Sequence, residues 1–280
     1  MNIKCLQWVG LWILGIIMSV QLTACSTPIE NLAIDTTNIV ALENVRTYPV
    51  RSTSGKRIEL GALRIKMLED SAMAIAAQAG LSWASQAINA KLEFDRKYLD
   101  TIYNFNAMML THGVIPPVLV EGDFTLNLDD PNTIRVSDRT YKIIKQARFA
   151  TTPPNWREYL WLAYSKPDLP DRSLLPRTTA ESRVWKRAIR AGWDKGIEQS
   201  FSIFQQSLAR LKRDYKGMVL YRKLLHEKMI SPPFVARTEL GITGDGTDMH
   251  INDQVLRIVE LPKLQVSGRH WRAVVVPGGV

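Results

Sequence analysis

The chain has 280 residues, 46% of them hydrophobic, and its 36 basic and 27 acidic side chains give a formal net charge of +9. The basic residues are interspersed and do not form the stripe that is typical of a nucleic-acid groove, so we expect no direct nucleic-acid binding. Apart from one apolar run near the amino terminus, no segment is apolar enough to span a membrane.

The first 24 residues have the pattern of a bacterial lipoprotein signal peptide. After Lys4 comes an uncharged apolar run, Trp8–Val20, whose 13 residues are too few for a membrane span, which needs ~20. The stretch Leu22-Thr23-Ala24-Cys25 then supplies a leucine, two small residues and a cysteine. This lipobox predicts cleavage between Ala24 and Cys25 and acylation of Cys25. An ordinary cysteine behind a signal or anchor is the alternative.

The mature chain would begin at Cys25 and face the periplasm from the outer membrane. Ser26 favours sorting to the outer membrane, because an Asp there would favour retention in the inner one. Removing 24 of 280 residues leaves 256 with a single cysteine, so no internal disulfide is possible and stability must come from a hydrophobic core. Loss of Lys4 leaves 35 basic against 27 acidic residues, near +8, which favours acidic partners unless these charges are merely solvated.

Three segments follow from this reasoning: a signal peptide at 1–24, a lipidated tether at 25–55, and a folded domain at 56–280. The tether is rich in Thr, Asn, Pro and Ser, and about 30 flexible residues reach ~30 Å. Helical periodicity begins near Leu60 and runs to about Leu92. We expect its packing seam at every seventh residue, namely Leu60, Met67, Ala74, Leu81 and Ile88. Small residues at 71–80 would let a second helix approach closely.

A second helical piece covers about 93–110, and residues 117–150 change to strand periodicity. Phe124, Leu126 and Leu128 alternate with polar residues, as in a half-buried strand, and we place a turn at 137–139. This predicts a small antiparallel unit. A short aromatic-rich helix is expected at 152–164.

A long helix begins at the capping box Thr178-x-x-Glu181 and ends before Pro232-Pro233. Its apolar stripe consists of Trp185, Ile189, Trp193, Ile197, Phe201, Phe204, Leu208 and Leu211. The remainder contains a Gly-rich loop at 240–253, a strand at 254–260 and an apolar piece at 271–276. We therefore expect a mainly helical α+β domain with a small antiparallel sheet.

No catalytic or metal-binding pattern is complete. His226-Glu227 lacks the second histidine of a helical zinc site, because position 230 is Ile, and we expect no metal and no cofactor. In the Gly-rich loop the acidic residues, among them Asp245 and Asp248, suit turns better than a calcium loop.

Three kinds of side chain remain candidates for function. Glu93, Glu121 and Glu158 are nominal acids for a cell-wall hydrolase, with solvated or salt-bridged carboxylates as the alternative. The basic cluster of Arg183, Lys186, Arg187 and Arg190 suits either solvent or an acidic partner. The aromatic stretch 155–164 suits a core or a protein contact.

Several unusual motifs occur together and in order over about residues 55–260. They are NFNAMML, PPVLVEG, TIRVSDRTYKIIKQARF, TTPPNWREYLW, GMVLYRKLL, SPPFV and LGITGDGTDMHINDQVLRI. With the lipobox, they resemble the DotC/TraI lipoprotein family of type IVB (Dot/Icm-like) secretion systems and I-type plasmid conjugation systems.

This resemblance implies a structural protein with no catalytic residue. Such a lipoprotein sits in a multi-copy outer-membrane core complex with a DotD-like lipoprotein, and helps to position a DotH-like channel subunit. Cys25 is the one functional residue that carries over. A cell-wall-hydrolysing or peptidoglycan-binding lipoprotein is the alternative.

Overall fold

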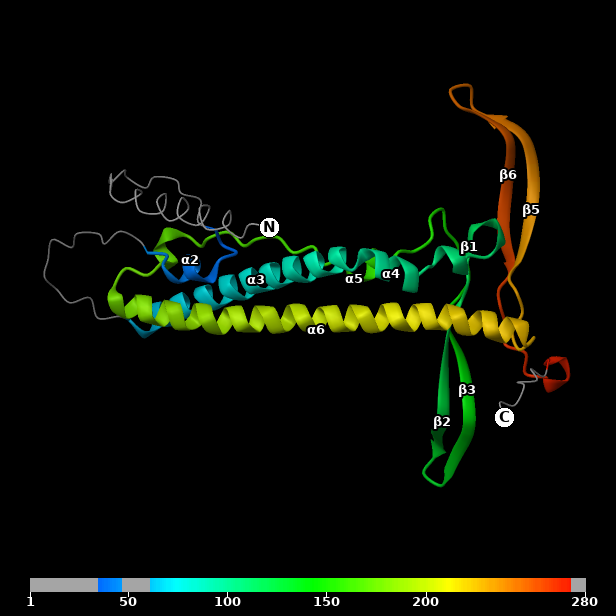
Figure 1. Ribbon diagram of the computed structural model, residues 1–280, viewed down its shortest axis with the longest axis horizontal. Coiled ribbons are helices and arrows are strands. Elements are labelled where there is room, and N and C mark those ends of the chain that lie inside the picture. Colours follow the sequence, from blue (N-terminus) through cyan, green and yellow to red (C-terminus); the bar gives the residue numbers. More distant parts are fainter. Residues whose placement is uncertain (1–34, 47–60, 273–280) are drawn as a thin grey trace, which may run out of the picture. The chain divides into compact units, whose positions relative to one another are not determined.

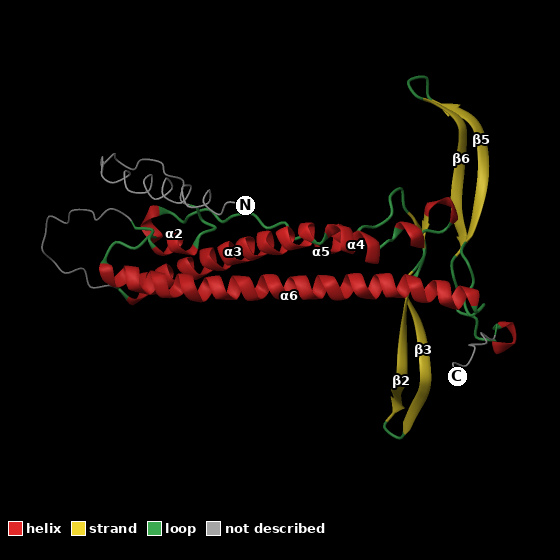
Figure 2. Cartoon of the chain, viewed as in Figure 1, coloured by secondary structure: helices red, strands yellow, loops and turns green. Residues whose placement is uncertain are grey.

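The computed structural model describes residues 35–46 and 61–272. It is α+β and mainly helical, with about 50% helix and 24% strand, which confirms the expected class (Figure 2). The helices described are α2 (Ile39–Glu43), α3 (Ala62–Phe94), α4 (Arg96–Ile102), α5 (Trp156–Leu160) and α6 (Thr179–His226). Short 3₁₀ turns lie at η1 (Asn106–Met108), η2 (Thr111–Gly113), η3 (Arg172–Leu174) and η4 (Gly268–His270). The strands are β1 (Val114–Ile115), β2 (Val118–Asp130), β3 (Thr133–Lys145), β4 (Arg148–Phe149), β5 (Phe234–Gly244) and β6 (Met249–Glu260).

Helices α3 and α6 run side by side, as Figure 1 shows, and their backbones touch. A Cβ atom built on Gly80 would lie 2.5 Å from the carbonyl oxygen of Trp193, and one built on Gly192 would lie 2.5 Å from that of Met73. Both distances are shorter than Cβ atoms show in real structures, so each position requires glycine. The expected close approach through small residues is confirmed.

The predicted seven-residue seam of α3 is wrong. Met67 is 50% exposed and Ala74 is also exposed, whereas the buried face carries Leu68, Ala72, Ile75, Ala76 and Ala79. The reason is that α3 approaches α6 with its smallest side chains, so the large residues lie beside the contact.

Helix α6 starts where its cap predicts. The Thr178 hydroxyl accepts a hydrogen bond from the Glu181 backbone nitrogen at 3.2 Å. The predicted stripe is buried at Trp185, Ile189 and Trp193, and again at Leu211. Between them the stripe breaks, because Phe201 is 55% exposed. The helix ends at His226, earlier than expected, and Lys228 takes a φ of 56°.

Part of the segment expected as a tether is folded. Helix α2 starts at the Asn38 cap, and Leu42 and Val45 are buried in a cluster around Trp185. The Trp185 indole nitrogen donates a hydrogen bond of 2.8 Å to the carbonyl oxygen of Leu42. A single side chain of α6 therefore holds α2 both by packing and by a buried polar contact.

Two further clusters complete the core. One surrounds Trp156 of α5 and includes Leu160, Phe105 and Leu211. The other surrounds Tyr221 of α6 and includes Leu119, Leu224 and Ile230.

The described strands form three separate two-stranded antiparallel sheets, β1–β4, β2–β3 and β5–β6. The β2–β3 turn lies at 131–132, and the turn predicted at 137–139 is wrong, since those residues lie inside β3. The true turn is fixed by Asp130, whose carboxylate accepts a hydrogen bond from the Asn132 nitrogen at 2.8 Å. The expected Gly-rich loop at 240–253 is largely strand, and only its tip at 245–248 turns between β5 and β6.

Candidate functional site

The predicted lipidation site lies outside the described residues. Ala24 and Cys25 belong to the first 34 residues, so the structure does not test them.

A buried carboxylate connects the starts of α3 and α6. Glu181 is 2% exposed, and its Oε1 accepts a hydrogen bond from Nε of Arg64 at 2.6 Å, while its Oε2 accepts one from the Arg177 nitrogen at 2.7 Å. Burial alone would raise the pKa of Glu181, but these donors outweigh it and the pKa is lowered. The carboxylate is thus held ionised as a structural connection.

A second buried carboxylate holds the base of the β2–β3 hairpin. Asp214 of α6 is fully buried, and it accepts hydrogen bonds from Lys145 Nζ at 2.5 Å, Arg213 Nη2 at 2.9 Å and the Tyr159 hydroxyl at 3.2 Å. Burial raises the pKa of Asp214, but Lys145 and Arg213 outweigh it and the pKa is lowered. Burial and this anion raise the pKa of Tyr159 to about 12. One carboxylate therefore connects β3, α5 and α6.

The base of the β2–β3 hairpin packs directly against the backbone of α6 at Gly217. A Cβ atom on Gly217 would lie 2.5 Å from the Leu119 carbonyl oxygen and 2.6 Å from Cγ1 of Val118. The first residues of β2 are accordingly buried against α6.

Two members of the basic cluster bind within the chain. Arg190 Nε donates to Glu43 of α2 at 2.6 Å, and Lys186 Nζ donates to the Asn44 side chain at 3.2 Å. The hydrogen bond from Arg190 lowers the pKa of Glu43. The acidic partner of this cluster therefore includes the chain's own α2.

The three glutamates nominated for catalysis each have a structural contact. Glu93 pairs with Arg96 at 3.0 Å and with Arg157 at 3.3 Å. Glu158 completes the capping box of α5 by accepting a hydrogen bond from the Asn155 nitrogen at 3.1 Å.

Glu121 lies apart from these two, on the β2–β3 hairpin. It accepts a hydrogen bond from the Tyr141 hydroxyl at 2.9 Å and pairs with Arg139 at 3.9 Å. Glu121 therefore lies on a different element from Glu93 and Glu158, and its contacts are with its own hairpin.

The histidines and the acidic loop do not form a ligand set in the described part of the chain. Within residues 35–46 and 61–272, no group of three or more His, Cys, Asp or Glu residues could hold a metal. Asp245 instead accepts hydrogen bonds from the Thr247 and Asp248 nitrogens at 3.0 and 3.1 Å, which shapes the tip of the β5–β6 hairpin. The Thr247 hydroxyl also donates to this carboxylate, at 2.6 Å, and this hydrogen bond together with the two from the backbone lowers the pKa of Asp245 to about 2.

The aromatic stretch divides between core and surface. Trp156 is 1% exposed and donates from its indole nitrogen to Asp100 at 2.6 Å, whereas Trp161 is 46% exposed. The core interpretation therefore holds for Trp156 and for Tyr159, which packs against the same cluster, but not for Trp161.

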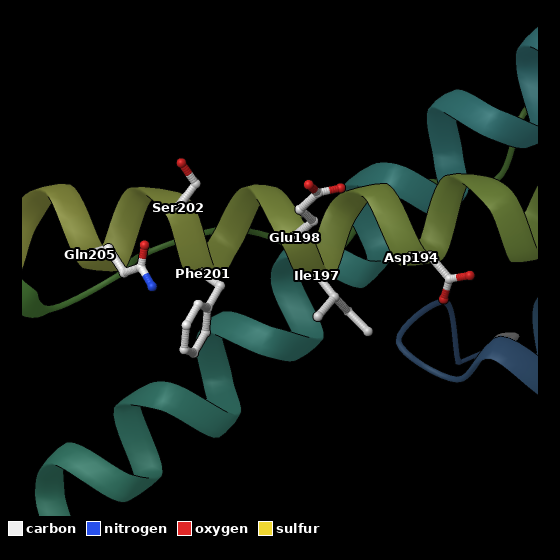
Figure 3. Close-up of a pocket in the computed structure, with 6 residues that line it drawn as sticks. All are labelled: Asp194, Ile197, Glu198, Phe201, Ser202 and Gln205. Carbon is white, nitrogen blue, oxygen red and sulfur yellow. The ribbon is translucent and has the colours of Figure 1, made fainter.

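A shallow hollow lies along α6 where the stripe breaks (Figure 3). In this view Ile197 and Phe201 lie on one side of α6, and Glu198 and Ser202 lie on the other. The lining residues are Asp194, Ile197, Glu198, Phe201, Ser202 and Gln205, all from this one helix. A hollow on a single helix does not bring polar groups together from several elements, as a catalytic cleft does.

Several large apolar side chains of the hairpins are exposed, which the sequence pattern does not predict. Leu126 and Leu128 of β2 are 70% and 71% exposed, and Ile242 and Ile251 of the β5–β6 pair are 71% and 64% exposed. The expected half-buried strand is thus exposed over its outer half. Strand β2 has 13 residues, longer than most strands, and only its first residues reach the core. The length of the alternating segment is the signal that could have predicted this exposure.

None of the helices that the structure describes is long and apolar enough to cross a membrane. No curated protein matches the chain. Over residues 62–273, well over half of its length, the chain matches the family described as type IV secretory system, conjugal DNA-protein transfer. The match agrees with the motifs described above. The chain belongs to this TraI family and is a protein of type IV secretion and conjugation.

Proposed function

We propose that this protein is a structural lipoprotein of the outer-membrane part of a type IV secretion or conjugation machine. Lipid on Cys25 would anchor it, and its folded domain would position a DotH-like channel subunit together with a DotD-like lipoprotein. The family match over residues 62–273 is the observation that carries the proposal. The lipobox at Leu22–Cys25 supplies the anchor.

The contacts of the charged residues support a structural role over a catalytic one. The buried carboxylates Glu181 and Asp214 are both engaged by cations and connect elements of the fold. The exposed apolar hairpins are what an assembling protein presents, because contiguous exposed apolar surface marks interaction sites.

The anchoring role is tested with two variants, one that lacks the lipid and one that keeps the lipid but stays in the inner membrane. In a conjugation donor, the wild type is compared with residues 26–280 exported by an ordinary cleavable signal, and with Ser26→Asp. The first variant carries no lipid, and the second carries lipid but is retained in the inner membrane. We expect both to reduce plasmid transfer and to reduce recovery of the channel subunit in the outer-membrane fraction. As control, residues 1–24 are replaced by the signal peptide of another outer-membrane lipoprotein, which should restore both.

Normal transfer and normal outer-membrane recovery of the channel subunit with the unlipidated form would refute the anchoring role. Mass spectrometry of the amino-terminal peptide tests the modification itself, with acylated Cys25 as the expected species.

The non-catalytic role is tested by incubating the purified protein with peptidoglycan. We expect no release of soluble muropeptides. Release that is abolished by Glu93→Gln, Glu121→Gln or Glu158→Gln would favour the cell-wall hydrolase instead.

A further inference from the structure

The outer half of the β2–β3 hairpin has one apolar face. Leu126 is the cross-strand neighbour of Val136, and Leu128 that of Ile134, and such neighbours point to the same side of a sheet. Their exposed fractions are 70% and 62% for the first pair and 71% and 60% for the second. Four large aliphatic side chains therefore share one face that the described parts of the chain leave in solvent.

Both outer edges of this hairpin are also open. Among the described residues, β2 pairs with β3 alone and β3 with β2 alone, over strands of 13 residues each. The outward backbone N–H and C=O groups of such strands are a template for a further strand. An isolated two-stranded ribbon is marginal in water, so a third and fourth strand would stabilise it.

The two edges carry opposite charge. Strand β2 contains acidic residues and no basic one, whereas β3 contains mostly basic residues. The acidic residues of β2 are Glu121, Asp123, Asp129 and Asp130; the charged residues of β3 are Arg135, Asp138, Arg139, Lys142 and Lys145. The β5–β6 hairpin lacks this asymmetry, since each of its strands contains both signs.

We propose that the β2–β3 hairpin is the contact between successive copies of this chain. The acidic edge β2 of one copy would pair with the basic edge β3 of the next. Hairpins that point the same way place β3 antiparallel to the neighbouring β2, so pairing continues the existing ladder. Because the two edges differ, the contact is head to tail and propagates around a ring or along a filament. The apolar faces of successive hairpins then form one continuous strip.

The second copy is the occupant that the charges favour. A hairpin with one acidic edge and one basic edge is complementary to a second copy of itself. A foreign strand of one charge would match only one of the two edges and would leave the other unpaired. The proposal deepens the assembly role proposed above and rests on it. Its test is nevertheless separate, because it measures self-association of the purified full-length lipoprotein, with no channel subunit and no secretion readout.

The experiment uses two edge variants. One is Glu121→Lys/Asp123→Lys, which leaves β2 with two lysines against two aspartates and so removes its net negative charge, and the other is Arg139→Glu/Lys142→Glu, which makes β3 net acidic. Tagged and untagged copies are produced in the same cells, extracted in detergent and purified by the tag. We expect each variant alone to recover roughly tenfold less untagged chain than wild type, because attractive pairs become repulsive.

Mixing the two variants gives the decisive result. Each chain still lacks its own Glu121–Arg139 ion pair, so any damage to the hairpin itself is unchanged by mixing. Only the contact between copies regains opposite charges, and we expect recovery near the wild-type level. A chain with all four reversals should likewise self-associate as wild type does.

Matched controls complete the test. Glu239→Lys/Glu260→Lys places the same charge change on the β5–β6 hairpin and should leave self-association intact. Self-association of either edge variant at the wild-type level would overturn the proposal, and so would failure of the mixture to recover. Failure of the four-reversal chain to co-purify untagged copies would overturn it as well.

Discussion

Replacing Gly192 by alanine sets two known effects against each other. A methyl group there would lie 2.5 Å from the Met73 carbonyl oxygen, 2.9 Å from Cβ of Ala76 and 3.0 Å from Cα of Met73. Ordinary van der Waals contact begins at 3.4 Å, so the helices must separate by up to roughly 0.9 Å. Alanine gains about 1 kcal/mol of helix propensity. Overpacking costs about 1–3 kcal/mol, and the upper end applies because two of the three contacts are backbone atoms that cannot rotate away.

We therefore expect Gly192→Ala to lower the free energy of unfolding by about 2 kcal/mol and the melting temperature by ~4–8 °C. Thermal and urea unfolding of the purified protein, followed by circular dichroism, would measure both. The matched control is Ala191→Gly on the exposed side of the same helix, which should cost about 1 kcal/mol through propensity alone. If Gly192→Ala raised the melting temperature instead, the two backbones would not be in contact.

The fold allows two further predictions. Asp214→Asn should cost about 1–2 kcal/mol at neutral pH, a modest loss because Lys145 and Arg213 are about half exposed. Since the pKa of Asp214 is lowered in the folded protein, its contribution is present above the unfolded value of ~3.9 and is lost as the pH falls through the lower folded value. The difference in stability between the two proteins should therefore shrink as the pH falls below ~3.9, and a constant difference in urea unfolding between pH 7 and 3 would contradict this. Leu42→Ala should cost about 2–5 kcal/mol by leaving a cavity beside Trp185, whereas Val40→Ala, at a 60% exposed position, should change stability by under about 0.5 kcal/mol; equal melting temperatures would mean that α2 is not part of the core.

The sequence predicts α6 better than any other element, because two independent signals agree there. Thr178 is a good cap, and large apolar residues recur at helical spacing from Trp185 onward. The stripe fails at Phe201, whose ring is left 55% exposed by the described part of the chain. The spacing of apolar residues indicates which side of a helix is apolar, but it does not indicate how far along that helix another element packs against it.

Helix α3 shows the opposite case. Its buried face includes Leu68 and Ile75, but it is made mostly of alanines, serines and Gly80, which carry little hydrophobicity, so Met67 and its heptad neighbours dominate the sequence pattern. Two helices pack through backbone contact where both have very small side chains. The pattern of α3 alone therefore does not predict this contact, which also depends on Gly192 of the facing helix.

Both hairpins were misjudged for reasons of turn chemistry. Ser137-Asp138 has turn-forming residues, but the real turn follows Asp130, where a proline at position 131 and Asn132 favour it more strongly. In β5–β6, the glycines and aspartates favour a loop in the sequence pattern, although most of these residues pair as antiparallel strands. Gly241 and Asn252 take positive φ of 80° and 58° beside the register shift, as bulges require. The lipobox needs no fold, and so the sequence alone predicts Cys25 as a functional residue.

Helix α6 also fixes the distance between two parts of the fold that attach to it. Trp185 holds α2, which follows the amino-terminal segment, and Asp214 holds the β2–β3 hairpin, so 29 residues of continuous helix separate the two attachments. At 1.5 Å per residue this is about 44 Å. Backbone contact with α3 leaves the helix no room to slide, so this interval is set by residue count. Adding or removing two turns between Trp185 and Asp214 would shift the hairpin by ~10 Å along the axis. Chains that share an assembly must therefore keep the same number of residues between these two positions, or place their hairpins at different heights.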